Sequence, residues 1–386
     1  MEPASIADLL VSMDRMPAGW ERAFRAVDRA LFAPDRVWPF TYDGQQHAVD
    51  RTLDPVAWEE AVRGNTALVT QWDDGRHTGP APGLVASSSA SMPSAVADML
   101  LDLDVHGGER VLDIGTGTGY TAALLAARGC AVTTVEVDEH LADQARKNLA
   151  RAGYPDVTVI TGDGAHGHSA GAPYERIHVT AGVRHIPAAW LEQARPGAIL
   201  LLPWGTDYSP HDAALRLVVE GPARACGPFT MALSFMKLRA QRAVPPAIDL
   251  PEGWPGVARA GATELSLADV VGGPYDPIAF VVGLRVPGCV PVLVPGEGAG
   301  DGTLWLTAGG AVPSVAAAGF ARGRQPNVLQ AGPRSLWSEV EEAYRWWDRV
   351  GRPEVFDFGL TVTVGAGDVH QVPWYGSLDH EIPERS

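Results

Sequence analysis

The chain has 386 residues, of which 46% are hydrophobic and 20% charged, and its formal net charge is −16. This length allows two or three domains with a large core, and the composition is that of a soluble globular protein. The negative charge argues against a nucleic-acid or anionic-membrane partner, because such surfaces require clustered Lys and Arg.

Cysteine usage and hydropathy exclude further classes. Cys130, Cys226 and Cys289 are far apart and form no C-x-x-C pair, which argues against a disulfide framework or a zinc site. His166 and His168 have the wrong spacing for a helical metal site, so we expect no metal. No apolar run approaches twenty residues, and the N-terminus has no basic segment followed by an apolar core. We therefore expect a cytoplasmic protein without a membrane segment.

The first 80 residues are predicted to form a helical and flap region. Residues 1–35 carry apolar side chains at three- and four-residue steps, as amphipathic helices do, and 56–62 suit a short helix. Residues 67–75 are predicted to be a strand that runs into an Asp-Gly turn. The Gly- and Pro-rich residues 76–86 favour a mobile flap.

A run of small, mostly hydroxyl residues at 87–94 precedes a predicted helix over 95–103. Serine is a good helix N-cap, and we expect one of these serines to cap the helix. Several hydroxyls ahead of a helix also suit the binding of a carboxylate. The residues alone leave both interpretations open.

The strongest motif begins with a short apolar strand over 111–114, followed by an Ala- and Leu-rich helix. Between them, three glycines alternate with small residues, namely Gly115, Gly117 and Gly119. Glycines tolerate positive φ and let a ligand approach backbone N–H groups, and the helix that follows offers its N-terminal amides to an anion. The pattern predicts a turn that binds a nucleotide cofactor.

The next acidic residue indicates which cofactor. A predicted strand over 131–135 delivers Glu136 at a spacing where a carboxylate accepts hydrogen bonds from ribose hydroxyls. Nicotinamide folds usually show Gly-x-Gly-x-x-Gly around a pyrophosphate, but this chain has Gly-x-Gly-x-Gly. S-adenosylmethionine has no pyrophosphate, and Asp113 fits a site facing the amino group of its methionine moiety. We therefore predict S-adenosylmethionine, with S-adenosylhomocysteine as its product.

A third predicted strand, 157–160, ends in Gly162-Asp163-Gly164. An acid in this position can accept from the exocyclic amine of adenine, and the neighbouring glycines leave room for the ring. Asp163 and Gly164 are therefore predicted cofactor contacts.

The alternation of strands and helices predicts the fold class. Strands over 176–180 and 198–202 continue the series, with a helix over 187–193 between them. This alternation favours parallel crossovers and a doubly wound α/β sheet. Residues 213–219 and 231–238 suit an antiparallel closing pair.

Proline and glycine become frequent from about residue 243, where Pro245-Pro246 indicates a boundary. We expect a small α/β module beyond it, without apparent chemistry. Its predicted elements are strands at 278–284 and 303–307, a helix at 336–350, and a hairpin of 358–364 and 369–374. The predicted domains are a helical and flap region at 1–80, a core at 81–242 and an accessory domain at 243–386.

Taken together, the motifs resemble those of protein-L-isoaspartate O-methyltransferases over roughly residues 15–242. The matching stretches are Ser91-Met92-Pro93, Asp113-Ile-Gly-Thr-Gly-Thr-Gly-Tyr, Val135-Glu136, Gly162-Asp163-Gly164, Ile177-His178-Val179-Thr180-Ala181 and Ile186-Pro187. The resemblance implies a Rossmann-like class I methyltransferase sheet with N-terminal helices, to which this chain adds a small C-terminal α/β domain.

The resemblance also implies roles for single residues. Ser91 would orient the substrate carboxylate by a hydrogen bond, and is the predicted catalytic residue. The implied cofactor-binding residues are Ser89, Asp113, Gly115, Gly117, Gly119, Glu136, Asp163, Gly164 and Thr180. The implied substrate-binding residues are Ser88, Ser91, Thr70 and Gln71.

Two departures from the family pattern are a serine run in place of its Thr-Ile-Ser stretch and the C-terminal residues 243–386. With the stretches 68–71 and 73–75, they resemble a subgroup associated with the maturation of ribosomal peptides such as graspetides and lanthipeptides. That resemblance implies methylation of an Asp in a modified precursor peptide, whose ester closes to aspartimide or relaxes to isoaspartate. The alternatives are repair of isoaspartyl residues in damaged proteins and a non-catalytic scaffold that binds peptides.

Overall fold

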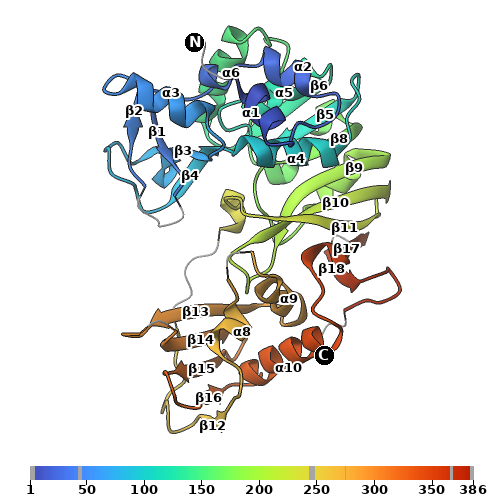
Figure 1. Ribbon diagram of the computed structural model, residues 1–386. Coiled ribbons are helices and arrows are strands. Elements are labelled where there is room, and N and C mark those ends of the chain that lie inside the picture. Colours follow the sequence, from blue (N-terminus) through green and yellow to red (C-terminus); the bar gives the residue numbers. More distant parts are fainter. Residues whose placement is uncertain are drawn as a thin grey trace.

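The computed structural model describes residues 5–41, 46–242, 248–273, 275–298, 300–365 and 368–382. Within these ranges the strands form three sheets, of four, nine and five strands. Figure 1 shows the nine-stranded sheet between the two smaller ones. No helix in the described part of the chain has both the length and the apolar character needed to cross a membrane.

The N-terminal region holds a four-stranded antiparallel sheet of order β2-β1-β3-β4 and three short helices. Its elements are α1 (Ile6–Ser12), α2 (Glu21–Ala26), β1 (Arg36–Pro39), β2 (Val49–Asp50), α3 (Pro55–Arg63), β3 (Leu68–Trp72) and β4 (Ala86–Ala90). The predicted helix over 56–62 and the predicted strand that turns at Asp73–Gly75 are confirmed.

The nine-stranded sheet has the order β18-β17-β11-β10-β9-β8-β5-β6-β7. The strands from β5 to β9 pair in parallel, and the rest pair antiparallel. The strands are β5 (Arg110–Ile114), β6 (Ala131–Glu136), β7 (Thr158–Thr161), β8 (Tyr174–Val179), β9 (Ala194–Gly205), β10 (Asp212–Gly221), β11 (Arg224–Leu233), β17 (Phe358–Gly365) and β18 (Asp368–Tyr375). The helices are α4 (Pro93–Leu103), α5 (Tyr120–Ala127), α6 (Glu139–Arg151) and α7 (Ala188–Glu192). The predicted α/β sheet with parallel crossovers is confirmed.

The C-terminal region adds a five-stranded antiparallel sheet of order β12-β16-β15-β14-β13, with helix α10 packed against its central strands. Its elements are β12 (Arg259–Ala262), α8 (Leu267–Val271), α9 (Pro277–Arg285), β13 (Cys289–Pro295), β14 (Gly302–Ala308), β15 (Ser314–Phe320), β16 (Asn327–Ala331) and α10 (Leu336–Arg349). The predicted strand at 303–307 and helix at 336–350 are confirmed.

The predicted strand at 278–284 is wrong, because this segment is helix α9. An apolar run that is buried all round fits a strand or a helix equally well by periodicity. The helix start is encoded just before it: the Asp276 side chain accepts from the N–H of Ile278, and Pro277 occupies the first turn. Asp followed by Pro is a helix N-terminus signal that decides the case.

Two further local predictions need correction. No serine caps α4, because its N-cap is Met92, which makes no side-chain cap; instead, the Ser94 N–H donates to Asn65 Oδ1 at 3.0 Å. The second strand of the antiparallel pair is β11, which lies at 224–233 rather than 231–238 and begins directly after a tight turn. Its early residues Cys226 and Gly227 gave no apolar alternation in the sequence.

The C-terminal hairpin lies in the main sheet. The strands β17 and β18 form the predicted hairpin, but β17 pairs with β11 and so extends the nine-stranded sheet. The chain therefore returns to the main sheet after building the five-stranded one. The predicted domain boundaries stay a prediction, and Pro245-Pro246 lie outside the described residues.

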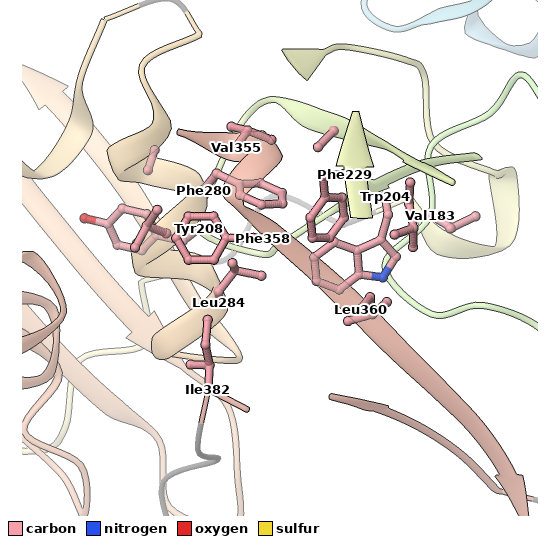
Figure 2. Close-up of a cluster of buried hydrophobic side chains, with 14 of the residues drawn as sticks. Val183, Trp204, Tyr208, Phe229, Phe280, Leu284, Val355, Phe358, Leu360 and Ile382 are labelled. Atoms are coloured by element: carbon pink, nitrogen blue, oxygen red, sulfur yellow. The ribbon is translucent and has the colours of Figure 1, made fainter. Parts of the chain in front are cut away.

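An aromatic cluster joins the main sheet to α9 (Figure 2). The Phe280 ring on α9 lies 5.0 Å from the Phe229 ring and 6.1 Å from the Trp204 ring, centroid to centroid, and the last two rings are 5.6 Å apart. All three side chains are buried. Because buried aromatic side chains carry much of the apolar area of a core, this cluster fixes α9 on the sheet.

We predict that Phe280→Ala lowers the free energy of unfolding by about 3–5 kcal/mol, because it leaves a cavity between the sheet and α9. Urea unfolding followed by tryptophan fluorescence measures the shift. Phe356→Ala is the matched control, since the Phe356 side chain is 61% exposed and its loss costs little. Equal unfolding midpoints for the two variants would contradict the role given to the cluster.

Candidate functional site

A cavity of about 1050 Å³ opens at the carboxyl ends of the parallel strands. Ligands of doubly wound sheets bind at this edge, because the loops after the strands converge there. The volume suits two reactants, since sites for one small molecule fall between about 300 and 1,000 Å³. Most of the predicted site residues line the cavity, namely Ser88, Ser89, Ser91, Gly115, Gly117, Glu136, Asp163, Gly164 and Thr180.

The glycine-rich loop between β5 and α5 forms one wall. Gly117 has a φ of +52°, a conformation that glycine adopts without strain, and its N–H donates to Glu136 Oε2 at 2.8 Å. Gly115 has a φ of +95°, and a Cβ there would press against Thr180 Oγ1. That hydroxyl donates to the carbonyl of Gly115 at 2.7 Å. Backbone conformation and close packing therefore both require glycine in this loop.

Glu136 is a carboxylate held at the cavity wall by backbone donors. Its Oε2 accepts from Gly117 and its Oε1 accepts from the N–H of Asp138 at 3.1 Å. Burial raises the pKa of Glu136 above its ordinary value, and the two backbone hydrogen bonds oppose that rise. Each carboxylate oxygen can accept more than one hydrogen bond, so Glu136 can still accept hydrogen bonds from the hydroxyl groups of a ligand.

Two predicted cofactor contacts do not line the cavity. Asp113 is 1% exposed, and its carboxylate is engaged by His178 Nδ1 at 2.8 Å and by the Thr134 hydroxyl at 2.8 Å. Asp113 is therefore bonded to both neighbouring strands, β8 and β6, and is not among the residues that line the cavity. Gly119 is the N-cap of α5 and packs against Leu149 of α6. Only tertiary structure shows these partners, which lie on other strands and helices.

The serine run forms strand β4 and not a linker. Its pairing with β3 contains two register irregularities, between Val69 and Gln71 and between Gln71 and Trp72. Such bulges re-aim side chains that would otherwise alternate between the two faces of a strand. Across the described residues the hydroxyls of Ser88, Ser89 and Ser91 make no hydrogen bond within the protein, although all three residues line the cavity. Their donors are available to a ligand.

The predicted substrate contacts Thr70 and Gln71 are not among the residues that line the cavity, although their neighbours Val69 and Trp72 on β3 are. The Gln71 amide instead accepts from Ser87 Oγ at 2.8 Å and donates to Asp138 Oδ2 at 3.2 Å. The Thr70 hydroxyl is buried and has no partner among the described residues. Direct ligand contact by these two residues stays a prediction, and the hydrogen bond from Ser87 shows that Gln71 holds β4.

A buried arginine that the sequence gave no reason to single out holds the serine strand. The guanidinium of Arg29 donates to the carbonyls of Ala90 at 3.1 Å and Ser91 at 2.9 Å. It also donates to carbonyls in the last turn of α3 and just after it, those of Val62, Gly64 and Thr66. Burial lowers the pKa of Arg29 to about 10, so the group stays charged at neutral pH. Its bonds join three segments: the one that carries Arg29, the end of α3 with the residues after it, and the end of β4 with Ser91.

An ionic network closes the cavity near Glu136. Arg239 bonds to Asp138 at 2.8 Å and to Asp74 at 3.1 Å, and Arg242 bonds to Asp74 at 2.7 Å. Both arginines line the cavity and follow β11. The sequence offered no signal for them, since their acidic partners lie far away in the chain.

The remaining wall comes from the residue before β10, from the end of β11 with the segment after it, and from the C-terminal region. His211 stands directly before β10, and its ring lies 4.7 Å from the ring of Tyr275, which belongs to the loop between α8 and α9. Both residues line the cavity. The C-terminal region, for which the sequence indicated no chemistry, therefore contributes a side chain to the site. In the described ranges no group of three or more potential ligands could hold a metal ion.

The parallel strands, the carboxyl-edge cavity and the Gly-x-Gly-x-Gly loop define a class I methyltransferase-like fold, with an additional antiparallel sheet region. Residues 78–218 match the family described as protein-L-isoaspartate(D-aspartate) O-methyltransferase (PCMT).

Curated relatives share this segment. The chain is 46% identical over 128 residues to protein-L-isoaspartate O-methyltransferase 1 of Rhodopseudomonas palustris, covering 33% of this chain and 51% of that protein. It is 40% identical over 140 residues to the protein-L-isoaspartate O-methyltransferase of Ignicoccus hospitalis, covering 36% of this chain and 65% of that protein. The chain thus spans only about half to two thirds of the length of these relatives.

Solved structures extend the likeness of the fold. One named protein-L-isoaspartate O-methyltransferase aligns with 95% of this chain and 98% of its own, with a TM-score of 0.53 and 21% identity. Such coverage includes the C-terminal region, which is therefore part of the shared fold. An S-adenosyl-L-homocysteine complex from Plasmodium falciparum aligns with 62% of this chain and all of its own, with a TM-score of 0.46 and 14% identity.

We predict that Arg29→Met lowers the free energy of unfolding by on the order of 3 kcal/mol, because it leaves several buried carbonyls without donors. Urea unfolding measures the loss. Arg22→Met is the matched control, because Arg22 is an exposed residue of α2. The assigned role of Arg29 fails if both variants unfold at the same urea concentration.

Proposed function

We propose that the protein is an S-adenosylmethionine-dependent O-methyltransferase that esterifies the side-chain carboxylate of an aspartyl or isoaspartyl residue in a peptide. The observation that carries the proposal is the convergence in one cavity of Glu136, Asp163 and the unengaged serine hydroxyls of β4. The family match over residues 78–218 supports it.

The residues present fit the cofactor. The carboxylates of Glu136 and Asp163 offer acceptors for ribose hydroxyls and for the adenine amine, and the two residues follow adjacent strands. Gly164 packs closely on Ile114, because a Cβ at that position would overlap the Ile114 side chain. The loop at Gly115 and Gly117 would lie against the methionine end. When bound, the cofactor supplies a methyl group on a sulfonium.

The chemistry requires positioning more than proton transfer. An aspartyl carboxylate has an ordinary pKa of about 3.9 and is ionised at neutral pH, so no general base is needed. The protein has to hold one carboxylate oxygen at roughly 3–3.5 Å from the methyl carbon, in line with the bond that breaks. Neutralisation of opposite charges is favoured where water is excluded.

Ser91 is proposed to orient that carboxylate. Its hydroxyl faces no protein acceptor in the described structure, and its backbone carbonyl is fixed by Arg29. Ser88, on β4, also lines the cavity and is proposed to share the substrate, whereas Ser89 is proposed to contact the cofactor. Methylation removes the negative charge and creates a leaving group, after which the next backbone nitrogen closes a succinimide.

We predict that Ser91→Ala and Glu136→Ala fail in different steps. Ser91→Ala lowers kcat/KM by about 10- to 100-fold, the loss of one hydrogen bond to a charged group, and leaves S-adenosylhomocysteine binding unchanged. Glu136→Ala weakens that binding. Methyl transfer to an isoaspartyl peptide and calorimetry separate the two effects, and Ser169→Ala, an exposed serine outside the cavity, is the control. Wild-type protein that binds the product but methylates no acidic peptide would instead be a peptide-binding scaffold.

Within this activity we propose an aspartate of a ribosomal precursor peptide as the acceptor. The serine run at 87–91 supports this choice, since it replaces the family's Thr-Ile-Ser and forms the wall nearest the proposed acceptor. Repair of damaged proteins is the alternative, and the fold shared over the C-terminal region with a structure named as an isoaspartate methyltransferase keeps it open.

We predict that the precursor is methylated at least tenfold faster than a generic isoaspartyl peptide, because a dedicated site holds more than the reacting carboxylate. Mass spectrometry follows the reaction as a gain of about 14 Da for the ester and a later loss of about 32 Da for ring closure. Equal or faster turnover of the generic peptide would establish repair and end the precursor proposal.

A further inference from the structure

Tyr275 brings the C-terminal region into the cavity. It lies in the loop between α8 and α9, outside the stretch that matches the family, and still lines the same cavity as Ser91. Its ring and that of His211 are inclined by 30° with centroids 4.7 Å apart. The two rings therefore form one aromatic wall.

Three contacts hold this wall in place. The Tyr208 hydroxyl donates to the carbonyl of Val270 at 3.1 Å, which ties α8 to the loop before β10. Gly283 of α9 lies so close to Thr206 that a Cβ would overlap its side chain. The Phe280 ring adds the aromatic cluster shown in Figure 2. Tyr275 is therefore carried by a docked pair of helices and not by an isolated loop.

Charges on this side of the cavity are already engaged. Arg15 pairs with Asp98, and Lys237 pairs with Asp212. Burial lowers the pKa of His211 below its ordinary value against the opposing charge of Asp212, so the ring is neutral at neutral pH. The other lining side chains from the end of β11 and the segment after it include Met231, Phe235 and Met236. This wall offers aromatic and thioether surface and no unpaired charge among these residues.

We infer that Tyr275 and His211 determine acceptor specificity by selecting peptides with an aromatic or large apolar residue beside the methylated acid. This inference rests on the proposed function. An apolar neighbour packs on the two rings, whereas an acidic neighbour loses its hydration without gaining a partner.

Two isoaspartyl hexapeptides that differ only in the residue after the modified acid, Phe or Glu, test this inference. Wild-type protein is expected to prefer the Phe peptide in kcat/KM by about 10-fold, the upper range for one aromatic pair. Tyr275→Ala and His211→Ala should each reduce the preference to less than about 3-fold, and Tyr275→Phe should keep it. Tyr344→Ala is the control in the same region, since Tyr344 lies on α10 and does not line the cavity.

Calorimetry with S-adenosylhomocysteine identifies folded variants with an intact cofactor site. If wild-type protein methylates neither these peptides nor the precursor, the proposed function and this inference both fail. Methylation without a preference for the Phe peptide would overturn the inference alone. The inference alone is also overturned if both Tyr275→Ala and His211→Ala bind S-adenosylhomocysteine normally and still prefer the Phe peptide.

Discussion

The candidate site depends on one buried cation. The guanidinium of Arg29 has no carboxylate partner among the described residues, and carbonyls from two segments solvate it: the end of α3 with the residues after it, and the end of β4 with Ser91. A buried charge is tolerated only where its donors are satisfied, so these segments are fixed relative to each other as well as to Arg29. The serine strand is thereby held at the cavity before any ligand arrives, and preorganisation of this kind is what an alkyl transfer between positioned groups requires.

A second constraint is the docking of the C-terminal region. Residues 248–350 form a separate antiparallel sheet with its own helices, yet the chain then returns to add β17 and β18 to the main sheet. Together with the cluster of Phe280, Phe229 and Trp204, this return fixes the loop that carries Tyr275. The region is therefore a wall of the cavity. Because a structure named as an isoaspartate methyltransferase shares the fold across nearly the whole chain, the presence of this region does not by itself indicate peptide maturation.

Prediction from sequence succeeded where the signal was local. The glycine-rich loop, Glu136 and Asp163 each stand within a few residues of a strand end, and parallel strands bring their carboxyl ends together. It failed for the segment 278–284, where an apolar run is ambiguous and the preceding Asp276 carries the decisive signal. It did not indicate the partners of Asp113, because an acid at a strand end looks the same whether a ligand or a neighbouring strand supplies its partner.

The sequence by itself determined the alternation of strands and helices between residues 111 and 202, the parallel α/β class and the acidic residues around the glycine-rich loop. These features depend on periodicity and on spacing within one βα unit. Only the tertiary structure decided that Gln71 holds a strand, that Arg29 supports Ser91, and that Tyr275 reaches the cavity. Their partners lie in other elements, and a hydrogen bond or a ring contact between distant segments leaves no pattern along a single chain.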